Sequence, residues 1–127
     1  MHLLGARLAR VVPGEVDVEL SYRADLVQQH GYLHAGVTTA IADSACGYAA
    51  LSLMMPEAAV LSVEYKVNLL SPARGDRFLA LGRVIKSGRT ITVVRAEVLA
   101  FDVQGDARPV LAMQGTMITS IGRGITD

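Results

Sequence analysis

The chain has 127 residues, a length that fits one domain with a sizeable core, and we expect residues 1–127 to form a single unit. Its 12 basic and 12 acidic side chains cancel, so charge gives no reason to expect binding to nucleic acid or to an anionic membrane. A hydrophobic content of 51% without net charge predicts that a partner subunit covers part of the apolar surface.

The N-terminal region is predicted to form a pair of strands. Residues 1–12, MHLLGARLARVV, show no signal-peptide pattern, so we expect a cytoplasmic protein, and Leu3 to Val12 is a weak strand candidate. Glu15 to Tyr22 alternates strictly between polar and apolar side chains, which is typical of a half-buried strand. Pro13-Gly14 between the two runs predicts a hairpin turn.

The next segments lead into a long helix. Arg23 to Gln29 is expected to form a short helical turn, and His30 to Ala35 a loop. Gly36 to Met55, GVTTAIADSACGYAALSLMM, is almost entirely small or apolar and has no proline, which predicts a helix of about five turns. Because it is apolar nearly all round, we expect burial on most of its faces. Cys46, the single cysteine, excludes an intrachain disulfide and is expected to be a buried, inert thiol.

Asp43 is the one carboxylate in this helix and the main functional clue. A carboxylate in apolar surroundings is costly unless it is paired, hydrogen-bonded or used in chemistry. The central Asp and the many Ala, Gly, Ser and Thr residues disfavour a membrane span. An N-cap role would leave the preceding run VTTAIA outside the helix. A purely structural aspartate stays the alternative to a catalytic one.

Four strand-like runs follow the helix. The first, LSVEYKVNL, is expected to place apolar residues on one face (Leu61, Val63, Tyr65, Val67 and Leu69) and polar residues on the other (Ser62, Glu64, Lys66 and Asn68). The later runs are Phe78 to Ile85, Ile91 to Phe101 and Val110 to Ile121, and the short turns around them predict an antiparallel meander. Gly82 and Gly115 inside these strands predict a close approach of the long helix.

One long apolar helix and about six antiparallel strands favour an α+β fold in which a curved sheet wraps around the helix, the hotdog architecture. His34-Ala35-Gly36, with Asp43 seven residues after the glycine, resembles the HGG-x6-D motif of the hotdog acyl-CoA thioesterases of the phenylacetate-degradation (PaaI-like) group. Three further motifs match that family in the same order, namely Ser62-Val63, Ser71-Pro72-Ala73 and Lys86-Ser87-Gly88-Arg89-Thr90. The resemblance covers roughly Val16 to Gly122.

The resemblance implies hydrolysis of acyl-CoA thioesters to the free acid and coenzyme A, without a cofactor because coenzyme A is part of the substrate. Asp43 would act as general base on water or as nucleophile, and the amide of Ala35 or Gly36 would polarise the thioester carbonyl. His34 is a candidate for orienting the substrate or the loop. Ser62 is a candidate for hydrogen bonding to the attacking water.

The sequence departs from the family pattern at two positions. Ala35 replaces the first glycine of the usual pair and adds a methyl group where the thioester approaches. Gln28 replaces an asparagine six residues before the motif histidine and is one methylene longer, which affects its candidate role in positioning water. His30 is expected to be a loop residue bonded to backbone.

Basic side chains near turns are candidates for binding the phosphates of coenzyme A. Similar positions in the family to Arg74, Lys86 and Arg89 have this role, and Ser87 and Gly88 complete the second turn. Solvated turn charges would show the same pattern, so both interpretations stay open. The 3 histidines and the cysteine show no ligand spacing, so we expect no metal.

The spacing of Gly36 and Asp43 predicts a site shared between subunits. Seven residues of helix separate them by about 10 Å, so one carbonyl cannot contact both. If both groups act, they come from different helices, so we expect a homodimer with antiparallel helices about a two-fold axis. The expected assembly is a dimer of dimers, a homotetramer.

Two other functions stay open. A hotdog dehydratase or hydratase would use a His and an acid together, such as His34 and Asp43, and a non-catalytic acyl-CoA-binding module would bind without turnover. A DNA-binding regulator is disfavoured because no segment is a basic helix-turn-helix. Phenylacetyl-type aryl groups, medium chains and hydroxylated aromatics all fit a pocket of small and apolar residues, so the acyl group is not assigned.

Overall fold

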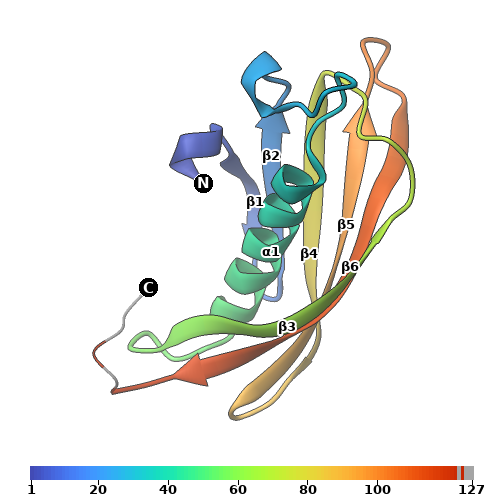
Figure 1. Cartoon of the computed structure of the whole chain (residues 1–127). Helices are drawn as coiled ribbons and strands as arrows, with labels where there is room; N and C mark the ends of the chain where they lie inside the picture. Colours follow the sequence, from blue (N-terminus) through green and yellow to red (C-terminus); the bar gives the residue numbers. More distant parts are fainter. Residues whose placement is uncertain (123, 125–127) are drawn as a thin grey trace.

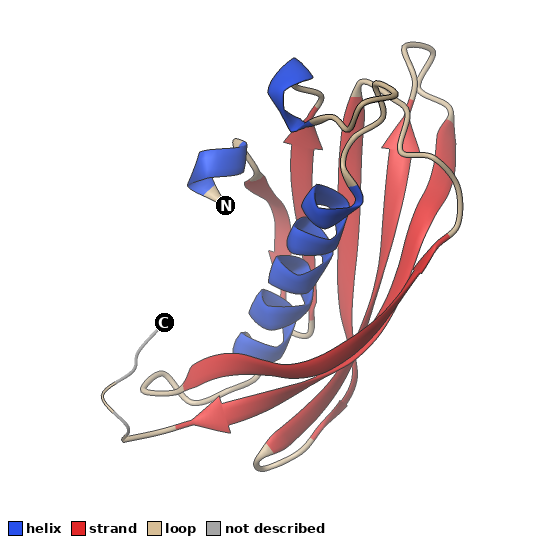
Figure 2. Ribbon diagram, viewed as in Figure 1, coloured by secondary structure: helices blue, strands red, loops and turns tan. Residues whose placement is uncertain are grey.

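The computed structural model describes residues 1–122 and residue 124. Within them lie two short 3-10 helices (His2–Leu4 and Ala24–Leu26), one α-helix, α1 (Ala35–Leu51), and six strands, β1 (Arg7–Val12), β2 (Glu15–Ser21), β3 (Ala59–Leu69), β4 (Arg77–Ser87), β5 (Ile91–Phe101) and β6 (Ala107–Ser120). The strands form one antiparallel sheet in the order β1-β2-β4-β5-β6-β3, which curves around α1 (Figures 1 and 2). The predicted hotdog fold is confirmed.

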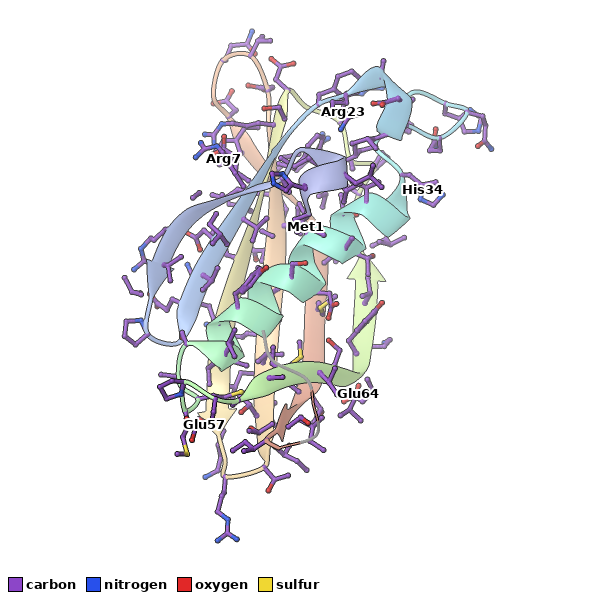
Figure 3. The ribbon with its side chains drawn as sticks, turned by 90° about the vertical axis from the view of Figure 1, so that its left-hand side faces the viewer. Met1, Arg7, Arg23, His34, Glu57 and Glu64 are labelled. Atoms are coloured by element: carbon purple, nitrogen blue, oxygen red, sulfur yellow. The ribbon has the colours of Figure 1, made fainter. Side chains whose placement is uncertain are left out.

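The helix buries one face against the sheet and leaves the other half-exposed. Its buried residues recur at helical spacing: Thr38, Ile41, Ala42, Ala45, Cys46, Ala49 and Ala50. On the side of α1 turned away from the sheet centre, Asp43 is half-buried and Tyr48 is exposed, and Figures 1 and 3 show this side of the helix facing outwards. The expectation that α1 is buried on most faces is therefore wrong for the single chain, and a desolvated Asp43 is not observed.

The helix ends earlier than predicted, at Leu51 rather than Met55. Ser52 stops it, because its hydroxyl accepts a hydrogen bond from the Gly14 amide at 2.8 Å and donates one to the Ala49 carbonyl at 2.7 Å. Residues 52–54 continue as turns towards Pro56, which cannot extend a helix. The end of α1 is thereby fixed to the turn between β1 and β2.

Gly82 on β4 lies where the sheet and α1 come closest, as predicted. Gly82→Ala is expected to destabilise the fold by about 1 to 3 kcal/mol, because a Cβ at Gly82 would overlap the backbone carbonyl of Ala45. Urea unfolding monitored by circular dichroism measures the change. Gly47→Ala is the matched control, since a Cβ there meets only Val60 Cγ1, at 4.0 Å, and alanine favours a helix. Equal midpoints for the two variants would contradict the close approach.

Gly115 has a different neighbour from the one predicted. A Cβ at this position would lie 2.9 Å from the Glu64 carbonyl oxygen and 3.1 Å from Tyr65 Cβ, so β3 approaches here and not the helix. The expectation of helix contact at Gly115 is wrong. The strand is close because Tyr65 is the register partner of Gly115 in the ladder between β3 and β6.

The first strand after the helix lies at an edge of the sheet. β3 pairs with β6, whereas β4 follows it in the chain but pairs with β2 and β5, so the predicted meander holds only for β4, β5 and β6. A register shift between Ser62 and Glu64 marks a β-bulge. Ser62 consequently pairs with Met117 and Glu64 with the adjacent Thr116, which places their side chains on opposite faces. The predicted placement of Ser62 with Glu64 is wrong.

Candidate active site

Asp43 and Ser62 form a hydrogen-bonded pair between α1 and β3. The Ser62 hydroxyl donates to Asp43 Oδ1 at 2.7 Å and also lies 3.2 Å from Met117 Sδ. The bulge in β3 makes this contact possible, because it turns Ser62 towards the helix. Asp43 Oδ2 has no hydrogen bond within the described residues. One carboxylate oxygen is thus held in place and the other is available for chemistry.

A cavity of about 300 Å³ opens beside this pair. It is lined by Asp43, Ser44, Gly47, Tyr48 and Leu51 of α1, Val60 and Ser62 of β3, and Met117 of β6. Gly47 leaves the space open, since a side chain there would project towards Val60. Asp43 and Ser62 were predicted from the sequence, whereas the other lining residues were not, although Gly47 and Leu51 follow Asp43 at intervals of four on the same helix face.

The cysteine near Asp43 is not a competing nucleophile. Cys46 is fully buried on the sheet side of α1. Burial, together with the negative charge of Asp43, raises the pKa of the Cys46 thiol to about 12. The reactive thiolate is therefore absent at neutral pH, in agreement with the expectation of an inert thiol.

The N-terminus of α1 is capped by His34. Its Nδ1 accepts a hydrogen bond from the Gly36 amide at 2.9 Å, so the Gly36 N–H already has a partner. The Val37 amide donates to the His34 carbonyl at 2.9 Å, whereas the Ala35 amide makes no hydrogen bond within the described residues. Of the two amides that the sequence indicated, Ala35 therefore offers the free donor. His34 lies exposed at this end of the helix (Figure 3).

The free amide and the carboxylate are on the same helix but far apart. Ala35 and Asp43 are both in α1, and eight residues at 1.5 Å each separate them by about 12 Å. A thioester carbonyl polarised by the Ala35 amide of one chain is out of reach of the Asp43 carboxylate of that chain. His34 and Asp43 are likewise not brought together within one chain.

A family model described as the thioesterase superfamily matches residues 30–105, more than half of the chain. The matched region begins before the His34 cap and extends past β5, so it includes Asp43 and Ser62. The chain belongs to the thioesterase superfamily. Membership supports a hydrolase, and the chemistry of the Asp43 and Ser62 pair agrees with it.

Individual members of the superfamily are similar to this chain over most of its length. The structure of a thioesterase family protein from Silicibacter pomeroyi is similar with a TM-score of 0.94 and 50% identity, over 96% of this chain and 89% of that one. A 1,4-dihydroxy-2-naphthoyl-CoA hydrolase of Listeria monocytogenes is 27% identical over 71% of this chain and 73% of its own length. The E. coli PaaI protein from the phenylacetic acid degradation operon shares the fold, with a TM-score of 0.82 at 22% identity over 94% of this chain and 82% of that one. The chain spans 65–73% of the length of its curated relatives.

In this superfamily member, Gln28 lies in the loop before α1 and is not part of the Asp43 pair. Its side-chain oxygen accepts a hydrogen bond from the His30 amide, and its backbone carbonyl accepts one from Gly31 at 3.0 Å. Within the described residues it makes no hydrogen bond to Asp43 or Ser62. Gln28 therefore shapes the loop before α1.

The basic candidates do not form one site within a chain of this superfamily member. Arg74 Nη2 donates to the Tyr32 hydroxyl at 3.0 Å, and its guanidinium lies 5.1 Å from the centre of that ring, next to the N-terminus of α1. The segment Lys86–Arg89 lies at the other end of β4, whose 11 residues span about 35 Å: Lys86 and Ser87 end the strand and Gly88 and Arg89 follow it. Arg74 and this segment therefore belong to different ends of the molecule.

The part of the chain that the structure describes lacks both a cluster of metal ligands and a helix that could span a membrane. Residues 1–122 and 124 contain no group of three or more His, Cys, Asp or Glu side chains placed to hold a metal ion. No helix among them combines the length and the apolar character that crossing a bilayer requires.

Proposed function

We propose that this thioesterase-superfamily chain hydrolyses acyl-CoA thioesters to the free acid and coenzyme A. The observation that supports it most is the Asp43 carboxylate, held by Ser62 on one oxygen and open to a cavity on the other side. A structural aspartate would be expected to have both oxygens paired or facing bulk solvent. Coenzyme A is part of the substrate and water is the second reactant, so the proposal needs no cofactor.

In the proposed mechanism, Asp43 Oδ2 takes a proton from water while the water oxygen attacks the thioester carbonyl carbon. The carbonyl oxygen becomes negative, and a helix N-terminal amide such as that of Ala35 stabilises it. The carbon–sulfur bond then breaks, and coenzyme A leaves as the thiolate or takes the proton from Asp43. In the alternative, the Asp43 carboxylate attacks the carbonyl carbon, the carbon–sulfur bond breaks and releases the coenzyme A thiolate, and water then hydrolyses the resulting mixed anhydride. Ser62 keeps Asp43 oriented in both cases.

We further propose that each site is completed by a second copy of the chain. Ala35 and Asp43 of one chain are about 12 Å apart, so the amide comes from the partner's helix. Two features support such a dimer: the outer face of α1 is uncovered, and β3 is a free edge with exposed apolar residues, Leu61 at 45%, Val63 at 58%, Tyr65 at 46% and Leu69 at 60%. A two-fold axis that crosses this edge at right angles to β3 would bring two copies of α1 together in antiparallel orientation. We also propose that two such dimers assemble into a homotetramer.

The acyl group is proposed to be aryl or medium-chain. The cavity is lined mainly by apolar and small side chains, which suits an acyl group without charge. A relative from Listeria monocytogenes is named as a hydrolase of an aryl-CoA, which supports an aromatic substrate. We also propose that the chain belongs to the PaaI-like subgroup and acts in the cytoplasm.

The test is a thiol-release assay over a panel of acyl-CoAs that includes aryl and straight-chain members. We expect release of coenzyme A from at least one class and none with Asp43→Asn. Binding of acyl-CoA without turnover would show that the chain is an acyl-CoA-binding module and not a hydrolase. Formation of an enoyl-CoA product would show that it is a dehydratase.

Gly47→Leu is expected to lower the rate at least about tenfold without destabilising the chain. The leucine side chain would enter the cavity beside Asp43, yet nothing at Gly47 obstructs a Cβ, and leucine favours a helix by up to about 1 kcal/mol over glycine. Steady-state kinetics on the best acyl-CoA, together with thermal unfolding, measures both effects. Gly47→Ala controls for the backbone change and should keep most of the activity. Full activity in Gly47→Leu would show that the substrate does not use this cavity.

A further inference from the structure

Met117 of β6 contacts the Asp43 and Ser62 pair and has no role in the mechanism above. Its Sδ lies 3.2 Å from the Ser62 hydroxyl oxygen, which in turn lies 2.7 Å from Asp43 Oδ1. The Ser62 hydroxyl carries one hydrogen, whereas a carboxylate oxygen and a thioether sulfur are both acceptors. Two acceptors therefore compete for one hydrogen beside the reacting carboxylate.

The sheet fixes the sulfur at this place. Met117 is 1% exposed, and it is the register partner of Ser62 in β3 and of Thr92 in β5. The bulge in β3 comes directly after Ser62, so the hydroxyl and the sulfur lie on the same face of the sheet. A buried side chain with a strand on each side has little room to change its conformation. The sulfur is therefore a fixed part of the site.

Within the described residues, Asp43 has no ion pair that would control its protonation. The side chains of β3 and β6 that line its cavity are uncharged. Its titratable neighbours are Cys46 and Tyr48, both on α1, and burial keeps the Cys46 thiol protonated at neutral pH. The strength of the hydrogen bond from Ser62 consequently has a direct effect on how readily Asp43 takes up a proton.

We propose that Met117 is a positioning residue that acts on Asp43 through Ser62. While Asp43 is ionised, its negative oxygen is the stronger acceptor and holds the Ser62 hydrogen. When Asp43 Oδ2 takes a proton from water, Oδ1 becomes an uncharged acceptor, and the Ser62 O–H turns partly towards the sulfur. Ser62 keeps its own hydrogen throughout, so one proton moves, from water to Asp43. The sulfur thus stabilises the neutral acid relative to the carboxylate and makes Asp43 a stronger base.

The effect on the rate rests on the proposed hydrolase and is measured with Met117→Leu. Leucine has a similar volume and apolar character but offers no acceptor. We expect kcat for the best acyl-CoA to fall about two- to tenfold, the range for one neutral hydrogen bond, with KM unchanged. Met113→Leu is the matched control, because Met113 is 4% exposed on the same face of β6 and makes no hydrogen bond to Ser62. Its kcat should equal that of the parent chain.

A double-mutant cycle shows whether Met117 acts through Ser62. In a Ser62→Ala background the hydroxyl is absent, so adding Met117→Leu should change kcat by less than about 1.5-fold. If Met117 only fills space, the substitution lowers kcat equally in both backgrounds and the proposal is wrong. An unchanged kcat in the single variant Met117→Leu would overturn it as well. Thermal unfolding of both methionine variants checks that they stay folded.

Proton uptake by Asp43 is also measurable without turnover, by NMR of its isotope-labelled carboxyl carbon over a pH titration. We expect Met117→Leu to take up the proton at a lower pH than the parent chain, by about 0.3 to 1 pH unit, which is the same two- to tenfold change. The shift is downwards because loss of the sulfur destabilises only the neutral acid. Met113→Leu should titrate as the parent chain does.

The titration separates the role of Met117 from the hydrolase itself. A downward shift in Met117→Leu, in a chain that hydrolyses no acyl-CoA, would support the role of Met117 and overturn the hydrolase. Hydrolysis of acyl-CoA by the parent chain, with no shift in Met117→Leu, would support the hydrolase and overturn the role of Met117.

Discussion

Asp43→Ala is expected to lower kcat/KM for acyl-CoA hydrolysis by at least about a hundredfold, the lower range for loss of an acid–base group. The change removes the oxygen that faces the cavity and the acceptor of the Ser62 hydroxyl together. Steady-state release of coenzyme A by the purified variant measures the loss. Asp43→Asn is the closer control, because the amide oxygen can still accept from Ser62 while the base is gone.

The same variant should fold normally. Asp43 lies on the half-exposed side of α1 and makes no ion pair within residues 1–122 and 124, so its removal leaves no buried charge without a partner there. Alanine also suits a helix better than aspartate. We expect the midpoint of thermal unfolding to stay the same or to rise slightly. Should the chain unfold at ordinary temperature, with residual activity that follows the folded fraction, Asp43 is structural and the mechanism is wrong.

Periodicity explains why the elements could be predicted from the sequence. β2 was predicted as Glu15 to Tyr22 and runs Glu15–Ser21, and β5 has the predicted bounds, Ile91–Phe101. β2 alternates strictly between polar and apolar residues, so its inward residues, such as Val16 and Val18, follow from the pattern alone. The central helix was recognised from its length, its small and apolar residues and its lack of proline, although its end depends on a contact between Ser52 and Gly14 that no local pattern shows.

The candidate site was only partly predictable, because its geometry depends on irregular backbone. Ser62 was a candidate for holding the attacking water, but alternation placed it on the wrong face of β3. A bulge inserts one residue into a strand without changing the polar and apolar pattern, so the turn of Ser62 towards Asp43 has no sequence signature here. The binding of the Gly36 amide by His34 was missed for a related reason, since Ser, Thr, Asp and Asn are the residues that usually cap helices.

The proposal that each site is shared between two chains predicts a second large loss of activity. Ala35→Pro is expected to lower the rate about a hundred- to a thousandfold, the cost of losing one donor to the oxyanion. Proline removes the Ala35 amide, which makes no hydrogen bond to any described residue, but suits the first position of a helix. The preceding residue, His34, has φ −61° and ψ 136°, the extended conformation that a residue before proline requires. Circular dichroism and unfolding of Ala35→Pro check that the helix and its cap survive.

Two inactive chains should then restore activity when they are combined. In a dimer of one Asp43→Asn chain and one Ala35→Pro chain, one site receives both defects and the other receives an intact amide and an intact carboxylate. Heterodimers purified through two different tags after co-expression should therefore show about half the activity of the parent dimer. Mixtures of the separate homodimers, kept from exchanging subunits, provide the background. If verified heterodimers of two folded chains stay inactive, the amide and the acid do not act across the dimer. One explanation would be that a different donor stabilises the oxyanion. The other would be that the thioester lies within one chain. In that case Ala35 would take no part in the reaction, because about eight residues of helix, or about 12 Å, separate it from Asp43.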